Sequence, residues 1–284
     1  MLRSLLLFAF CFATLGCGQA TYDARLNETS GYYAYINETE ALLDGEWKSR
    51  EPLKGIQIRP PKGFKKISAP TQEEDEDGNI ISEGVDERQP INIPGFYQGE
   101  LPGVLGAWKR NYEVSLAGDG SQEFTVRLYV LGQTSFGEEG NDLPFRDIVY
   151  NRLAADMSVE SANSWLAESY PGRDLYTRAI DYNEMRFSPG VAVNGFASSG
   201  VEIQLNARTE DGKSVVIMWV LPAGGLSSRE SRELTDSVTK TLQTLSIRKT
   251  SDTDSDDPEE VVKEENPDSG KKDKPKPAQR APSF

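Results

Sequence analysis

Three carboxylates in an acidic stretch of the chain have the spacing of calcium ligands. Glu73, Asp75 and Asp77 would occupy positions one, three and five of an EF-hand loop, and Gly78 would occupy the sixth. The twelfth position of such a loop should carry a bidentate glutamate, but Gly84 stands there. A block of like charges also repels itself and stays solvated. We therefore expect a solvated acidic loop here, with a partial calcium site as the alternative.

The residue types that most enzymes use for nucleophilic and acid–base catalysis are scarce. The chain has no histidine, and its two cysteines are Cys11 and Cys17. These counts exclude a Ser-His-Asp triad, a Cys-His pair and any histidine-ligated metal site. Gly224 and Gly225 precede Leu226 instead of the lysine of a phosphate-binding loop. We expect no catalytic residue, no cofactor and no metal; carboxylate or Ser-Lys chemistry is the remaining enzymatic alternative, although no motif indicates it.

The charge of the chain argues against nucleic acid as a partner. There are 31 lysines and arginines against 45 aspartates and glutamates, which gives a net charge of −14. Nucleic acids are bound by basic surfaces that release counterions from the phosphates. We therefore expect no nucleic acid as a partner.

Cys17 follows a segment with the three parts of a secretory signal peptide. Arg3 supplies a positive charge, residues 5–13 are almost wholly apolar, and the small residue Gly16 precedes Cys17. This order resembles the signal peptide of a bacterial lipoprotein, in which the cysteine after a small residue is lipidated and becomes the new N-terminus. The resemblance implies that residues 1–16 are removed and that Cys17 anchors the chain to a membrane.

Two other fates of this segment remain open. Small residues up to Ala20 would suit a general signal peptidase, which would release a secreted protein that begins at Thr21. The segment could also stay uncleaved in the cytosol. If Cys17 carries the several acyl chains of a bacterial lipoprotein, the attachment would be effectively permanent. Gly18 lacks the acidic character that retains enterobacterial lipoproteins at the inner membrane, so the same resemblance implies the outer membrane of the cell envelope.

The composition divides the rest of the chain into three parts. Residues 17–52 are predicted to form an N-terminal linker, and residues 53–248 carry the apolar patterns of one folded domain with an acidic loop at residues 71–89. Residues 249–284 have too few apolar side chains to offset their chain entropy, so we predict a disordered charged and proline-rich tail. Because both cysteines precede the domain, no disulfide can stabilise it.

Two β-hairpins are the clearest local patterns of the domain. Apolar residues alternate with polar ones in several strand-like runs, which indicates that one face of each strand is buried. Each hairpin is predicted from two such runs joined by a glycine-containing turn, at residues 108–116 and 123–131 and at residues 201–208 and 214–221. Shorter strands are predicted at residues 55–59, 175–182, 184–187 and 191–196.

Helices are predicted before, between and after these strands in the sequence. Three of them lie at residues 36–47, at residues 142–157 and, capped by Ser158, at residues 158–169. A final amphipathic helix follows Ser227 or Ser228, and its apolar stripe is formed by Leu234, Val238, Leu242 and Leu245. Strands, then helices, then strands and a closing helix predict the α+β class, with helices packed on an antiparallel β-sheet.

Three segments together resemble the PsbP-like superfamily, which includes an extrinsic photosystem subunit, a nuclear-import accessory protein and bacterial envelope lipoproteins. They are an early strand that runs into Pro-Pro-Lys-Gly-Phe (residues 56–64), a late apolar strand (residues 215–220) and the end of the closing helix (residues 242–247). The resemblance covers residues 53–248 and implies a PsbP-like αβα sandwich. It also implies a tendency to bind other proteins, and it supplies no catalytic residues because the family shares a fold and not a reaction.

These features together predict a non-catalytic envelope lipoprotein that binds another envelope protein or stabilises an assembly. The alternatives are a periplasmic or secreted module that binds a small ligand, and a hydrolase that works without histidine. Tyr32, Tyr33 and Tyr35 are candidates for contact with a partner. Trp219 lies in an apolar strand and is expected in the core.

Overall fold

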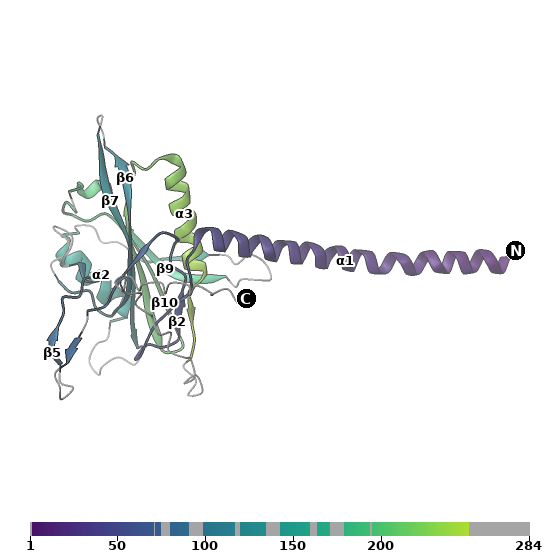
Figure 1. Cartoon of the computed structure of the whole chain (residues 1–284), viewed down its shortest axis with the longest axis horizontal. Helices are drawn as coiled ribbons and strands as arrows, with labels where there is room; N and C mark the ends of the chain where they lie inside the picture. The colour runs from purple at the N-terminus through teal and green to yellow at the C-terminus, as the bar shows by residue number, and fades with distance from the viewer. Residues whose placement is uncertain are drawn as a thin grey trace, which may run out of the picture. The chain divides into compact units, whose positions relative to one another are not determined.

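A computed structural model of the chain describes residues 2–70, 72–74, 80–90, 99–116, 120–134, 143–159, 164–170, 179–193 and 195–249 (Figure 1). For residues 2–19, 72–74, 80–83 and 198 it describes the backbone alone. The helices of this part of the chain are α1 (Leu2–Leu42), α2 (Phe145–Asp156) and α3 (Ser228–Gln243), with a 3-10 turn at Ser198–Gly200.

The main sheet has seven strands in the order β3-β6-β7-β11-β10-β9-β8, and all neighbours are antiparallel. The strand bounds are β3 (Lys65–Ile67), β6 (Val104–Ser115), β7 (Ser121–Thr134), β8 (Leu166–Tyr170), β9 (Ile180–Phe187), β10 (Val201–Glu210) and β11 (Lys213–Pro222). β6 pairs with β7 and β10 pairs with β11, so both predicted hairpins are confirmed. An antiparallel sheet together with helices also confirms the α+β class.

The turn of the β10–β11 hairpin needs two residues with left-handed backbone. Asp211 has a φ of 50° and Gly212 a φ of 73°, which suits a two-residue turn of type I′. We expect Gly212→Val to lower the free energy of unfolding by about 1–3 kcal/mol, because a β-branched residue is strained at this φ. Urea denaturation measures the loss. Gly224→Val is the matched control, since a Cβ at Gly224 meets nothing within 4 Å; equal losses in the two variants would contradict the explanation.

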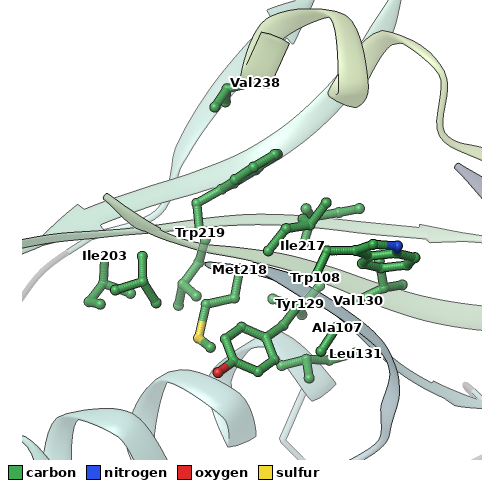
Figure 2. Packing of buried hydrophobic residues seen from close by; sticks show 14 of the residues in the cluster. Ala107, Trp108, Tyr129, Val130, Leu131, Ile203, Ile217, Met218, Trp219 and Val238 are labelled. Atoms are coloured by element: carbon green, nitrogen blue, oxygen red, sulfur yellow. The ribbon is translucent and has the colours of Figure 1, made fainter. Parts of the chain in front are cut away.

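Both faces of the sheet are covered at its centre. The register sets Trp219 beside Leu128 and Met218 beside Tyr129, and because neighbouring residues of a strand point to opposite faces, these two pairs do as well. Figure 2 shows Trp219 directed toward Val238 of α3, and Tyr129 and Met218 directed to the opposite side, where α2 packs on β11. Tyr129 is therefore fully buried, although the alternation in β7 predicted burial only for the other face.

α3 begins and ends with specific hydrogen bonds. The Ser227 side chain accepts from the backbone N–H of Glu230, and the Glu230 carboxylate accepts from the backbone N–H of Ser227. This capping box satisfies two donors that the first turn of a helix leaves free. At the other end, the Tyr182 hydroxyl of β9 donates to the carbonyl of Leu242 at 2.6 Å. The buried apolar residues of α3 are Leu234, Val238 and Leu242.

The helix predicted at residues 158–169 is wrong for residues 164–169, and residues 160–163 lie outside the described residues. Ser158 has a φ of 52°, in the left-handed region, and directly follows the C-cap of α2 at Met157. Leu166–Tyr170 forms strand β8, which pairs along its whole length with β9. The local sequence of this segment favours a helix, but helix propensity is a weak effect. The hydrogen bonds to β9 outweigh it.

The acidic segment contains a hairpin where a loop is predicted. β4 (Gln72–Glu74) and β5 (Ile80–Glu83) pair as an antiparallel two-stranded sheet with a bulge beside Glu73. Residues 75–79, which carry most of the calcium-like pattern, lie outside the described residues. The expectation of a partial calcium site therefore stays a prediction.

Two of the shorter predicted strands also differ from the structure. β9 runs without interruption from Ile180 to Phe187, so it joins the end of one predicted strand to the whole of the next. Residues 175–178 lie outside the described residues. The strand predicted at residues 191–196 is only an isolated bridge between Val193 and Phe196.

Residues 17–52 carry more regular structure than the linker predicted there. The backbone of α1 is continuous, so Cys17 lies within a helix. Of the short helix predicted at residues 36–47, residues 36–42 form the end of α1, whereas Trp47 begins a strand. A small sheet follows in the order β1-β2-β12, formed by β1 (Trp47–Lys48), β2 (Ile56–Ile58) and β12 (Ser246–Ile247). Within the part of the chain that is described, no helix has the length and apolar character needed to cross a membrane.

Candidate functional site

Most of the residues that the sequence singled out lie where the structure describes no side chains. Cys17 lies in the stretch of α1 for which only the backbone is described. Residues 250–284, like the calcium-like loop, lie outside the described residues. Trp219 is fully buried, which confirms its place in the core, whereas the side chains of Tyr32 and Tyr33 are exposed.

Tyr35 belongs to a contact that fastens α1 to α3. The ammonium group of Lys240 lies 4.9 Å from the centre of the Tyr35 ring and 3.1 Å from the carboxylate of Glu38. The Lys240 side chain is only 10% exposed, so these contacts replace most of the water around its charge. The C-terminal part of α1 is therefore packed on the domain through Tyr35 and Glu38.

A group of polar side chains lies together on strands β8, β9 and β10, where the sequence analysis identified no site. The register of β9 and β10 sets Glu184 opposite Asn206 and Arg186 opposite Gln204. Since residues two apart on a strand share a face, all four lie on one face of the sheet, and Tyr170 of β8 joins them through its hydroxyl. We call these five residues the Glu184 network.

Glu184 is the centre of this network and accepts four hydrogen bonds. Its Oε2 accepts from the Tyr170 hydroxyl at 2.5 Å, the Asn206 amide at 2.7 Å and the Gln204 amide at 3.3 Å. Its Oε1 accepts from Nε of Arg186 at 2.5 Å. The Glu184 side chain is 9% exposed, and a buried carboxylate is tolerated only when its oxygens are paired in this way.

These contacts keep the Glu184 carboxylate ionised. Burial by itself raises the pKa of this carboxyl, but the hydrogen bonds from Tyr170, Arg186 and Asn206 and the charge of Arg186 outweigh burial and hold the pKa below its usual value. Burial and the bond to Glu184 raise the pKa of the Tyr170 hydroxyl well above its usual value. Both shifts move the groups away from neutral pH, whereas a general acid or base is tuned toward it. The network therefore holds a buried negative charge that Arg186 and three donors on neighbouring strands keep in place.

The first of two hollows at the network lies between the sheet and α3. Its volume is about 210 Å³, and we call it the α3 pocket. From the sheet, Tyr170, Arg186 and Gln204 line it, and from α3 the apolar Leu234 and Val238 do. The remaining lining residues are Glu202, Leu221, Pro222, Leu226, Ser231, Thr235 and Thr239.

The second hollow is larger and follows strand β8. It has a volume of about 650 Å³, and we call it the β8 hollow. Leu166 and Glu168 of β8 line it together with Tyr170, Glu184 and Arg186 of the network; the other lining residues are Ser164, Ser169 and Met185. Since Tyr170 and Arg186 also line the α3 pocket, the two hollows adjoin. One site thus combines a polar floor, an apolar wall from α3 and the edge strand of the sheet.

A sequence signal for the network existed but was incomplete. Glu184 and Arg186 alternate with Met185 and Phe187, which indicates a strand with one polar face. The same alternation is expected of any strand whose polar face meets water. Only the packing of the neighbouring strands and α3 shows that Glu184 is buried and paired across strands.

No protein-family model and no curated protein matches the chain. Among the described residues, no group of three or more cysteines, aspartates and glutamates is arranged to hold a metal ion.

Proposed function

We propose that this chain is a non-catalytic envelope lipoprotein whose domain binds another protein at the α3 pocket and the β8 hollow. The observation that carries the proposal is that the two hollows adjoin beside an edge strand and share a floor of fixed polar groups. A floor held by cross-strand hydrogen bonds is pre-organised, which reduces the entropy lost when a partner binds. The binding of another envelope protein, or the stabilisation of an assembly, is the function that this arrangement serves.

The proposal includes a PsbP-like αβα sandwich for residues 53–248. Two features support it: α2 and α3 pack on opposite faces of the antiparallel sheet, and the segments that resemble the family fall on β2, on β11 and on the end of α3. Fold by itself does not assign a function, so the binding role is argued from the site and not from the likeness.

The proposed anchor is tested by replacing Cys17. We expect Cys17→Ser to abolish incorporation of a labelled fatty acid and to move the protein out of the membrane fraction, because lipidation needs the thiol. Cys11→Ser is the matched control and should keep both the label and the membrane fraction. Labelling of neither the wild type nor the control, with a mature N-terminus at Thr21, would instead establish secretion after Ala20.

The proposed partner is tested by affinity capture from crosslinked cells, with the full chain and with a version that ends at Arg248. A partner retained by both versions supports the domain as the binding element. A partner lost on truncation assigns binding to residues 249–284 and contradicts the proposed site. Capture of no envelope protein by either version contradicts the proposed function as a whole.

Binding of a small ligand is the second candidate function, and the α3 pocket favours it. Its volume of about 210 Å³ leaves room for a ligand of few atoms, since pockets for drug-sized ligands measure about 300–1,000 Å³. The hydroxyl-bearing residues Ser231, Thr235 and Thr239 line the pocket together with Arg186. A thermal-shift screen tests this candidate: a ligand that stabilises the wild type should fail to stabilise Thr235→Trp, which fills the pocket. Asp236→Trp, on the same helix and outside the pocket lining, should respond like the wild type.

A further inference from the structure

The two edges of the main sheet differ in their protection against pairing with another chain. β3 has three residues and exposes Lys65 and Lys66, and lysines on an edge strand hinder such pairing. β8, at the opposite edge, has five residues with neither lysine nor proline, and its register with β9 is regular. Among the described residues, no strand pairs with the outer side of β8. Lysines therefore protect the β3 edge, whereas the β8 edge has neither such lysines nor a pairing strand among the described residues.

The side chains of β8 are accessible to a partner. Leu166 is 60% exposed although it is a large apolar residue. Glu168 is also exposed, and Tyr170 is half-buried at the boundary with the α3 pocket. An open ladder edge with side-chain hollows beside it is the arrangement to which an extended peptide adds as a further strand. Backbone hydrogen bonds then supply affinity, and the hollows supply specificity.

The side chains that line the two hollows carry a negative charge. Glu168, Glu184 and Glu202 provide three carboxylates and Arg186 provides one guanidinium, which leaves a net charge of −2. Arg186 is already bonded to Glu184 and Glu202, whereas Glu168 forms no ion pair with a described residue. The residues that α3 contributes to its pocket are uncharged. The site is therefore complementary to a basic segment.

We propose that β8 is the docking edge for an extended, basic segment of a partner protein. This inference rests on the proposed protein-binding function and adds the chemistry of the partner to it. The segment pairs with β8 as an eighth strand of the main sheet, places a lysine or arginine beside Glu168 and sets an apolar side chain against Leu166.

Two other occupants of this edge are less complementary to it. A second copy that pairs its own β8 antiparallel about Glu168 would set two carboxylates opposite each other, and like charges directly opposite are destabilising. The chain's own lysine-rich tail is interrupted by Pro275 and Pro277, and proline cannot donate a hydrogen bond to a strand ladder. Both occupants are distinguished in the test.

The test is a calorimetric titration of the purified full chain with the short blocked peptide Thr-Val-Thr-Lys-Thr-Val-Thr. Its lysine and valines lie two residues apart, as Glu168 and Leu166 do on β8, so in either strand direction they share the face of these two side chains. We expect saturable one-to-one binding. A peptide with glutamate in place of lysine, and a lysine peptide with alternate backbone amides N-methylated, should each bind at least about tenfold more weakly, because they lose the charge match or the ladder hydrogen bonds.

Variants of the chain then locate the binding edge. Glu168→Lys should weaken binding of the lysine peptide at least about tenfold, since it reverses the charge beside the added strand. Glu123→Lys is the matched control, because Glu123 is an exposed glutamate on β7, and it should bind like the wild type. Leu166→Ser should also weaken binding. All three changes are at exposed side chains, and circular dichroism verifies that each variant is folded.

Several results would overturn the inference. Absence of saturable peptide binding is one of them, and equal peptide binding by the wild type and Glu168→Lys is another. Peptide binding that appears only after truncation at Arg248 is the third, and it would make the chain's own tail the occupant of the edge. A dimer in light scattering that Glu168→Gln strengthens, by removing the facing carboxylates, and that the peptide dissociates would make a second copy the occupant. Affinity capture from crosslinked cells distinguishes failure of this inference from failure of the proposed function. If Glu168→Lys still captures an envelope partner, the proposed function is retained and only the docking edge at β8 is contradicted.

Discussion

Trp219→Ala should lower the free energy of unfolding by about 3–5 kcal/mol, the range for removing a large aromatic side chain from a core. Trp219 is fully buried at the centre of β11 and meets the Phe64 ring edge to face, with the ring centres 6.3 Å apart. Figure 2 shows that its ring also fills the space toward Val238 of α3. Alanine would leave a cavity at the contact between the sheet and α3. Guanidinium denaturation measures the loss.

The control for this prediction is Trp219→Phe. The indole Nε1 is buried and has no hydrogen-bond partner among the described residues, so phenylalanine removes an unpaired donor while it keeps most of the ring. We expect a loss below about 1.5 kcal/mol for this substitution. A loss as large as that of Trp219→Ala would show that an undetected partner of Nε1, and not packing, accounts for the effect.

Glu184→Gln should lower the free energy of unfolding by about 2–3 kcal/mol at neutral pH. The carboxylate accepts from Arg186 on one oxygen and from three donors on the other. A glutamine side chain has an NH₂ group in place of one of these oxygens, so this group faces hydrogen-bond donors that then lack an acceptor. The substitution also removes the negative charge that strengthens the hydrogen bond to Arg186. Glu123→Gln, an exposed residue of β7, should change the free energy of unfolding by less than about 0.5 kcal/mol.

The effect of Glu184→Gln should depend on pH with a defined sign. The pKa of Glu184 is lower in the folded protein than the usual glutamate value that applies in the unfolded chain. Its stabilising contribution is therefore fully present above the usual pKa and is lost as the pH falls through the lowered folded pKa. The difference between wild type and variant should be largest at neutral pH and shrink in acid. A difference that is constant from neutral pH down to acid would show that the lost bonds, and not the charge, carry the effect.

Trp219 and Glu184 both support the region where α3 packs on the main sheet. Trp219 packs α3 on the sheet, and Glu184 holds the strands on which the α3 pocket and the β8 hollow are built. Circular dichroism and binding of the lysine peptide can be measured on the same variants. Glu184→Gln should weaken peptide binding less than Glu168→Lys does, since Glu184 is buried beneath the site and Glu168 is at its surface.

The chain's own amino acids determined the features that depend on neighbours in sequence. The Asp211-Gly212 turn, the β6–β7 hairpin and the cap at Ser227 follow from backbone preferences and hydrogen bonds within a few residues. The absence of histidine likewise excludes imidazole chemistry without any structure. The prediction of lipidation at Cys17 rests on sequence alone.

Tertiary structure decided the features that depend on residues far apart in the chain. Leu166–Tyr170 forms a strand because β9 pairs with it. Tyr129 is buried because α2 covers the face of the sheet that the alternation in β7 predicted to be exposed. The Glu184 network joins Tyr170 to Asn206 through the register of three strands, and the α3 pocket needs a helix that begins after residue 227. Periodicity in a sequence indicates that a face is polar, but it does not show whether water or another part of the chain meets that face.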